Sequence, residues 1–215
     1  IVRRFAPVVE EYSIDECFAD LTGSANRRRG YEQIAGRVKE ALEEELSITF
    51  SVGLAPSKVL AKVASNHIKP SGLTFIPVPE ISDYLASLPL SGVWGIAERM
   101  ERRMRELGVT TAGAYAARER VWIEEHMAKP YREIHAELNG VSVLPVTEGG
   151  TRRYRSIQKS KTFTPPSDDR QYVLSRLSKN IENACIKLRR HGLAASHVFF
   201  FLKTARPSLI RTNGV

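Results

Sequence analysis

Two neighbouring acidic residues, Asp15 and Glu16, stand between two short apolar segments. Adjacent carboxylates where two strands meet can place several oxygens around a hard cation, and Mg²⁺ prefers oxygen ligands. A solvated acidic turn is the alternative interpretation. Ile14, Phe18 and Leu21 favour the cation site, because these apolar residues would hold the acids beside a buried sheet.

A second group of residues that could take part in chemistry is a row of lysines. Lys58 and Lys62 are four residues apart, so they share one face of a helix, and that face continues towards Lys69. A solvated lysine face is the alternative. A lysine row near a carboxylate-bound cation would suit a polyphosphate, because lysines and cation could share its charge.

Three segments that contain these residues resemble, in order and spacing, the palm domain of Y-family (lesion-bypass) DNA polymerases. They are VEEYSIDE at 9–16, VGLAPSKVLAKVAS at 52–65 and KPSG at 69–72. The resemblance implies that Asp15 and Glu16 are catalytic carboxylates that bind Mg²⁺, with two ions in the complete enzyme. It also implies that Lys69 contacts the triphosphate of the incoming nucleotide. We therefore expect both acids to face solvent near Lys69.

The reaction that the resemblance implies is template-directed, two-metal nucleotidyl transfer to a primer 3′-hydroxyl. That reaction also needs a third carboxylate near the start of the palm, and a fingers domain. We expect a chain that begins at Ile1 to lack both and to extend a primer very poorly by itself. A catalytically silent DNA-binding homologue, serving as an adaptor in a mutagenesis or repair complex, is the alternative function. The retained acids and Lys69 favour the enzyme.

The segment SGVWGIA at 91–97 resembles the helix-hairpin-helix of the same family's thumb. Its backbone N–H groups at Gly95, Ile96 and Ala97 would approach a DNA phosphate, and Arg99 would add charge. The family usually has Gly where Ala97 stands, and a plain helical turn is the alternative interpretation. The residues Val93-Trp94-Gly95 of this hairpin are similar to those of the family's bacterial SOS mutagenesis polymerases.

A basic segment near residue 155 carries hydrogen-bond donors on both faces of a predicted strand over 155–163. Together with the following helix and strand, it resembles the family's little finger domain, which we expect to be incomplete after about residue 205. A solvated strand is the alternative. The expected DNA-binding residues here are Arg152, Arg153, Arg155, Ser156, Lys159, Ser160 and Lys161.

The net charge of +8 is unevenly distributed. Residues 1–76 hold 10 basic and 10 acidic side chains, and residues 77–150 hold 8 and 11. Residues 151–215 hold 14 basic and 3 acidic side chains, a net charge of +11. A field of one sign on a small domain attracts polyanions, of which nucleic acid is the commonest.

The pattern of apolar residues predicts an α+β fold in three domains. We expect a partial palm with a mixed sheet at 1–76, an all-helical thumb at 77–143, a linker at 144–152 and a little finger at 153–215. The strands are predicted within 8–22 and at 48–54, 155–163 and 195–204. The helices are predicted at 31–46, after the N-cap Ser57, at 80–88, 97–107, 111–117, 121–127 and 131–138, and between Asp168 or Asp169 and Gly192.

The remaining features limit the cellular setting. Cys17 and Cys185 lack metal-ligand spacing and indicate a reducing, cytoplasmic location. We expect no membrane segment. The resemblance implies primer–template DNA and deoxynucleoside triphosphates as partners, and it allows a sliding clamp or other replication and repair proteins.

Overall fold

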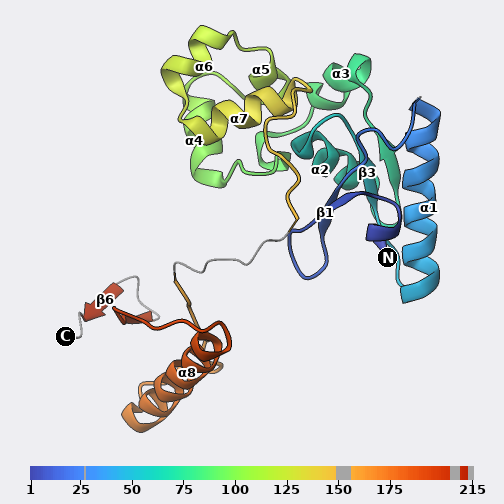
Figure 1. Cartoon of the computed structure of the whole chain (residues 1–215). Helices are drawn as coiled ribbons and strands as arrows, with labels where there is room; N and C mark the ends of the chain where they lie inside the picture. The colour runs from blue at the N-terminus through green and yellow to red at the C-terminus, as the bar shows by residue number, and fades with distance from the viewer. Residues whose placement is uncertain (27, 149–155, 204–208, 213–215) are drawn as a thin grey trace. The chain divides into compact units, whose positions relative to one another are not determined.

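The computed structural model describes residues 1–26, 28–148, 156–203 and 209–212. Contacts within the chain divide it into two compact units, residues 1–150 and 151–215. Figure 1 draws both, and each is described here by itself. The chain combines helices with short strands, as the predicted α+β class requires.

The first unit begins with a short 3₁₀ helix, η1 (Val2–Arg4), and a β-hairpin. Strands β1 (Val8–Glu11) and β2 (Cys17–Asp20) are antiparallel, with Glu11 opposite Cys17 in the last pair. The connection, called turn 12–16 below, is closed by the N–H groups of Tyr12 and Ser13, which both donate to the Glu16 carbonyl at 3.0 Å. The two strands predicted within 8–22 are confirmed.

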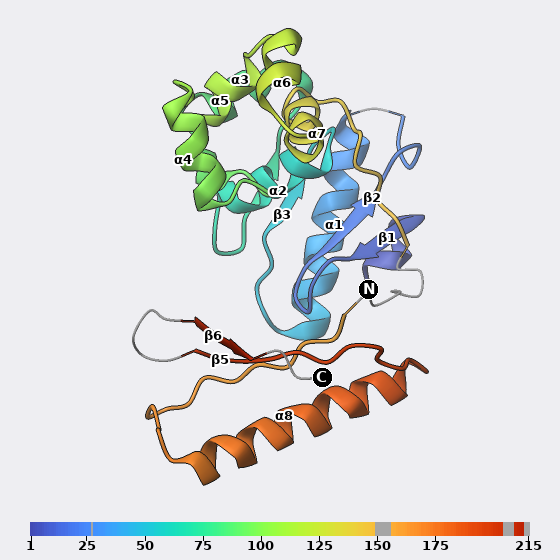
Figure 2. The same ribbon diagram turned by 90° about the vertical axis from the view of Figure 1, so that its left-hand side faces the viewer.

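A β-α-β unit follows the hairpin. Helix α1 (Arg28–Leu46) leads to β3 (Val52–Leu54), α2 (Lys58–His67) and β4 (Leu73–Phe75), and β3 and β4 are parallel. Both α1 and α2 pack against this strand pair (Figure 2). Ser57 is the N-cap of α2, as predicted, and its hydroxyl accepts from the Leu60 N–H at 3.4 Å. Among the described residues these strands form two separate two-stranded sheets, where we expected one mixed sheet.

Short helices fill the rest of the first unit, close to their predicted positions. They are η2 (Val78–Glu80), α3 (Ile81–Ala86), η3 (Leu90–Gly92), α4 (Glu98–Glu106), α5 (Ala112–Ala116), α6 (Arg120–His126) and α7 (Lys129–Leu138). One continuous apolar core joins α2 to these helices, and it includes Leu60, Leu85, Met104, Tyr115 and Leu138. This core holds the β-α-β unit and the helical part together, because each buries apolar surface against the other.

The second unit contains α8 (Arg170–Arg190) and the antiparallel strands β5 (Phe200–Lys203) and β6 (Leu209–Thr212). The Asp169 carboxylate caps α8 by accepting from the N–H groups of Gln171 and Tyr172. At the other end Gly192 has a φ of +62°, and the Leu193 N–H bonds to the Leu188 carbonyl at 3.0 Å. This is a Schellman motif, and it confirms the predicted helix stop.

The strand predicted at 155–163 is wrong for its described part. Residues 156–163 are not a strand, and no strand in the described part of this unit pairs with them. Residues 156–163 are mostly polar and exposed, so pairing them would bury little apolar surface. Strand β6 was not predicted from the sequence.

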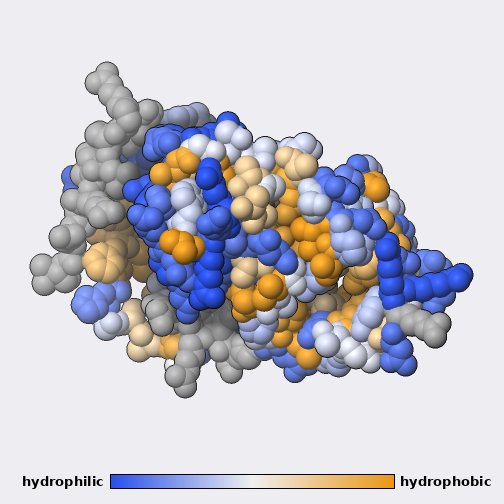
Figure 3. Space-filling view, turned by 90° about the horizontal axis from the view of Figure 1, so that it is seen from above, coloured by the Kyte–Doolittle hydropathy of each residue, from blue (hydrophilic) through white to orange (hydrophobic). Residues whose placement is uncertain are grey.

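The surface is mixed in character. On the face drawn in Figure 3, apolar side chains are interspersed with polar ones. None of the helices in the described ranges is long and apolar enough to cross a membrane.

Candidate active site and nucleic-acid interface

Turn 12–16 presents Asp15 to solvent. The Ser13 hydroxyl donates to Asp15 Oδ1 at 2.6 Å, which orients the carboxylate. This hydrogen bond is the main reason why the pKa of Asp15 lies below its ordinary value, and the positive charges of Lys62 and Lys69 lower that pKa further. Asp15 is therefore ionised at neutral pH and within the field of two lysines.

Glu16 lies on the same turn and faces α2. Its carboxylate forms an ion pair with the Lys62 ammonium. Lys69 follows the end of α2 and is exposed. The fold thus brings the acidic turn and the row of lysines together, although 46 residues separate Glu16 from Lys62.

Ile14 does not anchor the acids. It is fully exposed at the tip of the turn, so its expected role beside a buried sheet is wrong. The reason is geometric: residues 12–16 extend beyond the last strand pair, Glu11 with Cys17, and no sheet lies beneath the tip. The turn is supported at its base instead, where Tyr12 and Phe18 contact Trp94.

The donor set of turn 12–16 fits part of the coordination shell of a divalent cation. Asp15 and Glu16 supply hard carboxylate oxygens, and the rest of an octahedral shell could come from water or substrate. Among the described residues no three His, Cys, Asp or Glu side chains are grouped so as to hold a metal ion. A cation would also compete with the Lys62 ammonium for Glu16.

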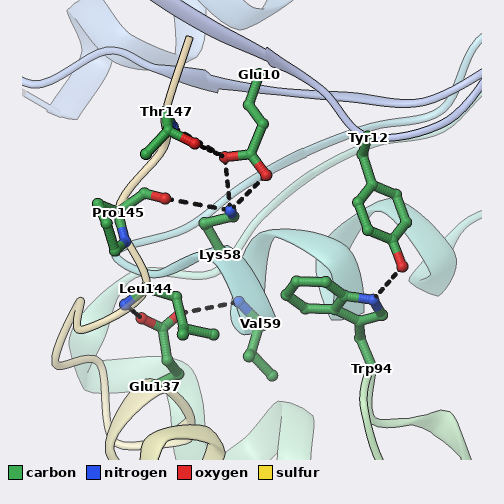
Figure 4. Close-up of polar contacts among 9 residues, drawn as sticks. All are labelled: Glu10, Tyr12, Lys58, Val59, Trp94, Glu137, Leu144, Pro145 and Thr147. Carbon is green, nitrogen blue, oxygen red and sulfur yellow. Dashed lines mark hydrogen bonds and ion pairs between the residues drawn. The ribbon is translucent and has the colours of Figure 1, made fainter. Parts of the chain in front are cut away.

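A partly buried ion pair next to this turn was not foreseen from the sequence. The Lys58 ammonium bonds to both carboxylate oxygens of Glu10, at 2.8 and 3.0 Å, and to the Pro145 carbonyl at 3.3 Å (Figure 4). The Thr147 N–H also donates to Glu10 at 2.9 Å. Burial raises the pKa of Glu10, but the hydrogen bonds from Lys58 and Thr147 outweigh it and hold that pKa below its ordinary value. Lys58 is thus not part of a solvated face.

Glu137 is a buried acid that was likewise not foreseen from the sequence. It belongs to α7, is fully buried, and accepts from the Val59 N–H at the start of α2 at 3.1 Å. Its other oxygen accepts from the N–H groups of Val143 and Leu144 at 2.7 and 2.8 Å (Figure 4). A carboxylate at a helix N-terminus is favourable, since it meets free N–H groups and the positive end of the helix dipole. Contacts so distant in sequence leave no local signal.

Loop 91–97 connects η3 to α4. Gly95 has a φ of +94°, and a Cβ there would lie 2.8 Å from Ile134 Cδ1, so the position requires glycine. The side chain of Ile96 is buried, while Ala97 and Arg99 are exposed. Ala97 is the N-cap of α4 without a side-chain hydrogen bond. The Ile96 N–H already donates to the Val93 carbonyl at 3.1 Å, so a phosphate contact here would use the N–H groups of Gly95 and Ala97.

The expected DNA contacts of the second unit are only partly described. Ser156, Lys159, Ser160 and Lys161 are exposed on an extended segment. Arg152, Arg153 and Arg155 lie outside the described residues. The roles of all these residues in DNA binding stay predictions.

Comparison with known proteins gives matches over both units. The sequence profile of the impB/mucB/samB family matches residues 1–66, and that of the family's C-terminal domain matches residues 154–213. DNA polymerase IV 1 of Bacillus subtilis is 30% identical over 210 residues, which cover 95% of this chain and 49% of the relative. DNA polymerase IV of Moorella thermoacetica is 34% identical over 172 residues, 80% of this chain and 42% of the relative.

Solved structures agree with these matches. DinB from Sulfolobus solfataricus is 30% identical with a TM-score of 0.53, over 64% of this chain and 41% of that one. A Y-family polymerase chimera of Dbh and Dpo4 superposes with a TM-score of 0.71 over 99% of this chain and 61% of that one. At 24% identity the chimera supports the fold alone. The chain spans about half the length of the curated relatives it matches.

Proposed function

The chain belongs to the impB/mucB/samB family of Y-family DNA polymerases, and we propose that it carries the palm, thumb and little finger residues of a lesion-bypass DNA polymerase. The observation that supports the proposal most directly is turn 12–16, which sets Asp15 and Glu16 within the field of Lys62 and Lys69. Asp15 is exposed, so its carboxylate is accessible to a ligand.

In this proposal Asp15 and Glu16 hold divalent cations, for which Mg²⁺ is the expected ion. Such cations would activate the primer 3′-hydroxyl and neutralise the triphosphate. Ser13 keeps the Asp15 carboxylate oriented and ionised through its hydrogen bond. The exposed Lys69 ammonium adds a positive charge on the same side, where it would attract the triphosphate of the nucleotide.

Both units contribute residues to DNA binding in this proposal. Loop 91–97, in the thumb, offers backbone N–H groups around the left-handed Gly95. Two glutamates in the first turn of α4, Glu98 and Glu101, pair with Arg102 and Arg105, which leaves little net charge there. Residues 151–215, which include the proposed little finger at 153–215, carry a net charge of +11, and we propose that they supply most of the affinity.

A salt series tests the DNA grip. Affinity for primer–template DNA should fall steeply with salt, with a log–log slope of roughly −0.9 per phosphate contact. Joint substitution of Arg153, Arg155, Lys159 and Lys161 with alanine should weaken binding to all sequences and flatten the slope by about 2 to 4 units.

Matched changes in the helical part provide the control for that series. Arg118, Arg120, Lys129 and Arg132 are also four basic residues, but this part of the chain carries more acidic than basic side chains. Arg120 and Lys129 already pair with Glu124 and Glu133. Their joint substitution should therefore matter much less, as measured by fluorescence anisotropy. Equal losses of DNA affinity for the two sets of substitutions would contradict the proposal that the little finger supplies most of that affinity.

Cation binding at turn 12–16 has its own test. Terbium luminescence excited through the nearby Tyr12 and Trp94 should report an ion held by Asp15 and Glu16. Asp15→Asn should remove the signal while DNA affinity stays within about twofold of the wild type. Asp20→Asn is the control, because Asp20 lies at the far end of β2 and accepts from the Thr22 N–H. DNA binding without an Asp15-dependent signal would favour the silent adaptor.

A further inference from the structure

We infer that Trp94 is a positioning residue that couples loop 91–97 to turn 12–16. The Trp94 Nε1–H donates to the Tyr12 hydroxyl at 2.9 Å (Figure 4). The contact joins segments that are 82 residues apart in the chain. The functional part of this inference rests on the proposed function, because loop 91–97 is the proposed phosphate site and turn 12–16 the proposed cation site.

The loop that carries Trp94 is held firmly in the helical part. Val93 and Ile96, on either side, are only 2% and 5% exposed and belong to the main core. Gly95 lies against Ile134, and its φ of +94° is a backbone conformation that favours glycine. The backbone at Trp94 therefore belongs to an anchored loop, from which the partly buried indole projects.

On the other side, Trp94 contacts both flanks of the turn. Its ring centroid is 5.3 Å from that of Tyr12, at 90°, and 5.4 Å from that of Phe18. Tyr12 and Phe18 also meet edge to face, at 5.7 Å. All three separations lie in the favourable range for aromatic pairs. The indole thus contacts the first residue of the turn and, beyond Asp15 and Glu16, strand β2.

A buried cation completes the cluster. The Lys58 ammonium lies 4.9 Å from the centroid of the Phe18 ring and 5.9 Å from that of Trp94. The same ammonium is held by Glu10 of β1. Cation–π attraction at these distances holds the rings on the side of α2. We call the contacts among Tyr12, Phe18, Trp94 and Lys58 the aromatic contact.

The consequence is a route between the two proposed sites. Tyr12 is the first residue of the turn, and its N–H closes the turn onto the Glu16 carbonyl. A phosphate held at Gly95 to Ala97 restrains loop 91–97 and, through Trp94, the residue that starts the acidic turn. Any ligand that favours the anchored loop should therefore also favour the closed turn, since both share the same contact.

Hydrogen exchange of the Tyr12 and Ser13 amides tests the contact without DNA. Trp94→Phe keeps an aromatic ring but removes the N–H donor, and Tyr12→Phe removes the acceptor from the other side. Each variant should speed exchange of these two amides about three- to tenfold, as expected for loss of one hydrogen bond in a partly exposed contact. Trp122→Phe is the matched control, since Trp122 stacks on His126 in the helical part and should leave both amides within about twofold of the wild type.

Primer–template DNA then tests the coupling. In the wild type, DNA should slow exchange both in loop 91–97 and at Tyr12 and Ser13. In Trp94→Phe it should slow exchange in the loop alone. Unchanged turn amides in both DNA-free variants would overturn the contact, and wild-type protection of the loop without the turn would overturn the coupling. Failure of DNA to protect either segment would count against the proposed DNA site, whereas the DNA-free comparison would still decide the contact.

Discussion

Glu137 offers the sharpest test of how the first unit is held together. Its side chain is fully buried, and its two oxygens accept from Val59 in α2 and from Val143 and Leu144 after α7. The residue itself lies in α7, so one carboxylate joins three segments. Glu137→Gln changes the size of the side chain very little, but it replaces one accepting oxygen with an NH₂ group that cannot accept.

The cost follows from the groups left without a partner. Glutamine can turn its single oxygen towards Val143 and Leu144, which leaves the buried Val59 N–H facing another donor. Hydrogen bonds to charged groups contribute roughly 1.5–3 kcal/mol each, and an unsatisfied buried donor costs about 1–3 kcal/mol. We expect Glu137→Gln to lower the free energy of unfolding by about 2 kcal/mol. Glu137→Ala should lower it by about 3 kcal/mol or more, because it also leaves a cavity.

Urea unfolding followed by tryptophan fluorescence measures this effect selectively. The chain has two tryptophans, Trp94 and Trp122, and both lie in the first unit. Glu133→Gln, also on α7, is the control. Glu133 is 33% exposed and pairs with Lys129 at 3.7 Å, so its substitution should cost about 0.5 kcal/mol or less. A loss below about 0.5 kcal/mol for Glu137→Gln would show that the carboxylate is not what joins the three segments.

Three further predictions concern α1 and the β-α-β unit that follows it. Hydrogen bonds from Lys39, then from the Phe50 N–H and Ser71, lower the pKa of Glu43 to about 2. The ionised carboxylate therefore stabilises the fold, so Glu43 contributes to the free energy of unfolding at neutral pH, and this contribution is lost as the pH falls from about 4.5 towards 2. The free energies of unfolding of the wild type and Glu43→Gln, followed in acid titrations, should converge near pH 2. A difference between them that stays constant with pH would refute this. Gly53→Ala should prevent soluble folding, because its Cβ would lie 2.1 Å from the Ala61 carbonyl oxygen. Gly36→Ala, in α1, would place a Cβ in ordinary contact with Leu73 Cδ2 at 3.9 Å, and it should instead stabilise the chain by about 0.5–1 kcal/mol, as thermal unfolding would show.

Much of the local structure can be predicted from the sequence. The helices follow from apolar residues repeated at helical spacing, which place one side of each helix in the core. The N-caps Ser57 and Asp169 and the stop at Gly192 depend on side-chain and backbone chemistry within a few residues. Asp15 and Glu16 could be selected as candidates because their residue types and their position between two strands are visible in the sequence.

Strands were predicted less well, since a strand is stabilised by its partner. Residues 156–163 have β-forming residues but are not paired in the described part of the chain. The short strand β4 was not predicted. It pairs with β3, and α2 connects the two strands along the chain. Whether a short segment joins a sheet depends on backbone groups that are distant in sequence, so local pattern does not decide it.

The surroundings of the candidate site were decided by the tertiary structure alone. The three lysines of the row have different surroundings. The fold buries Lys58 against Glu10 and pairs Lys62 with Glu16. It leaves Lys69 exposed. The contact of Tyr12 with Trp94 likewise joins residues with no relation along the chain. Helical spacing determines which side chains share a face, whereas packing between elements determines which charges and rings meet across it, because those distances are set only once the core has formed.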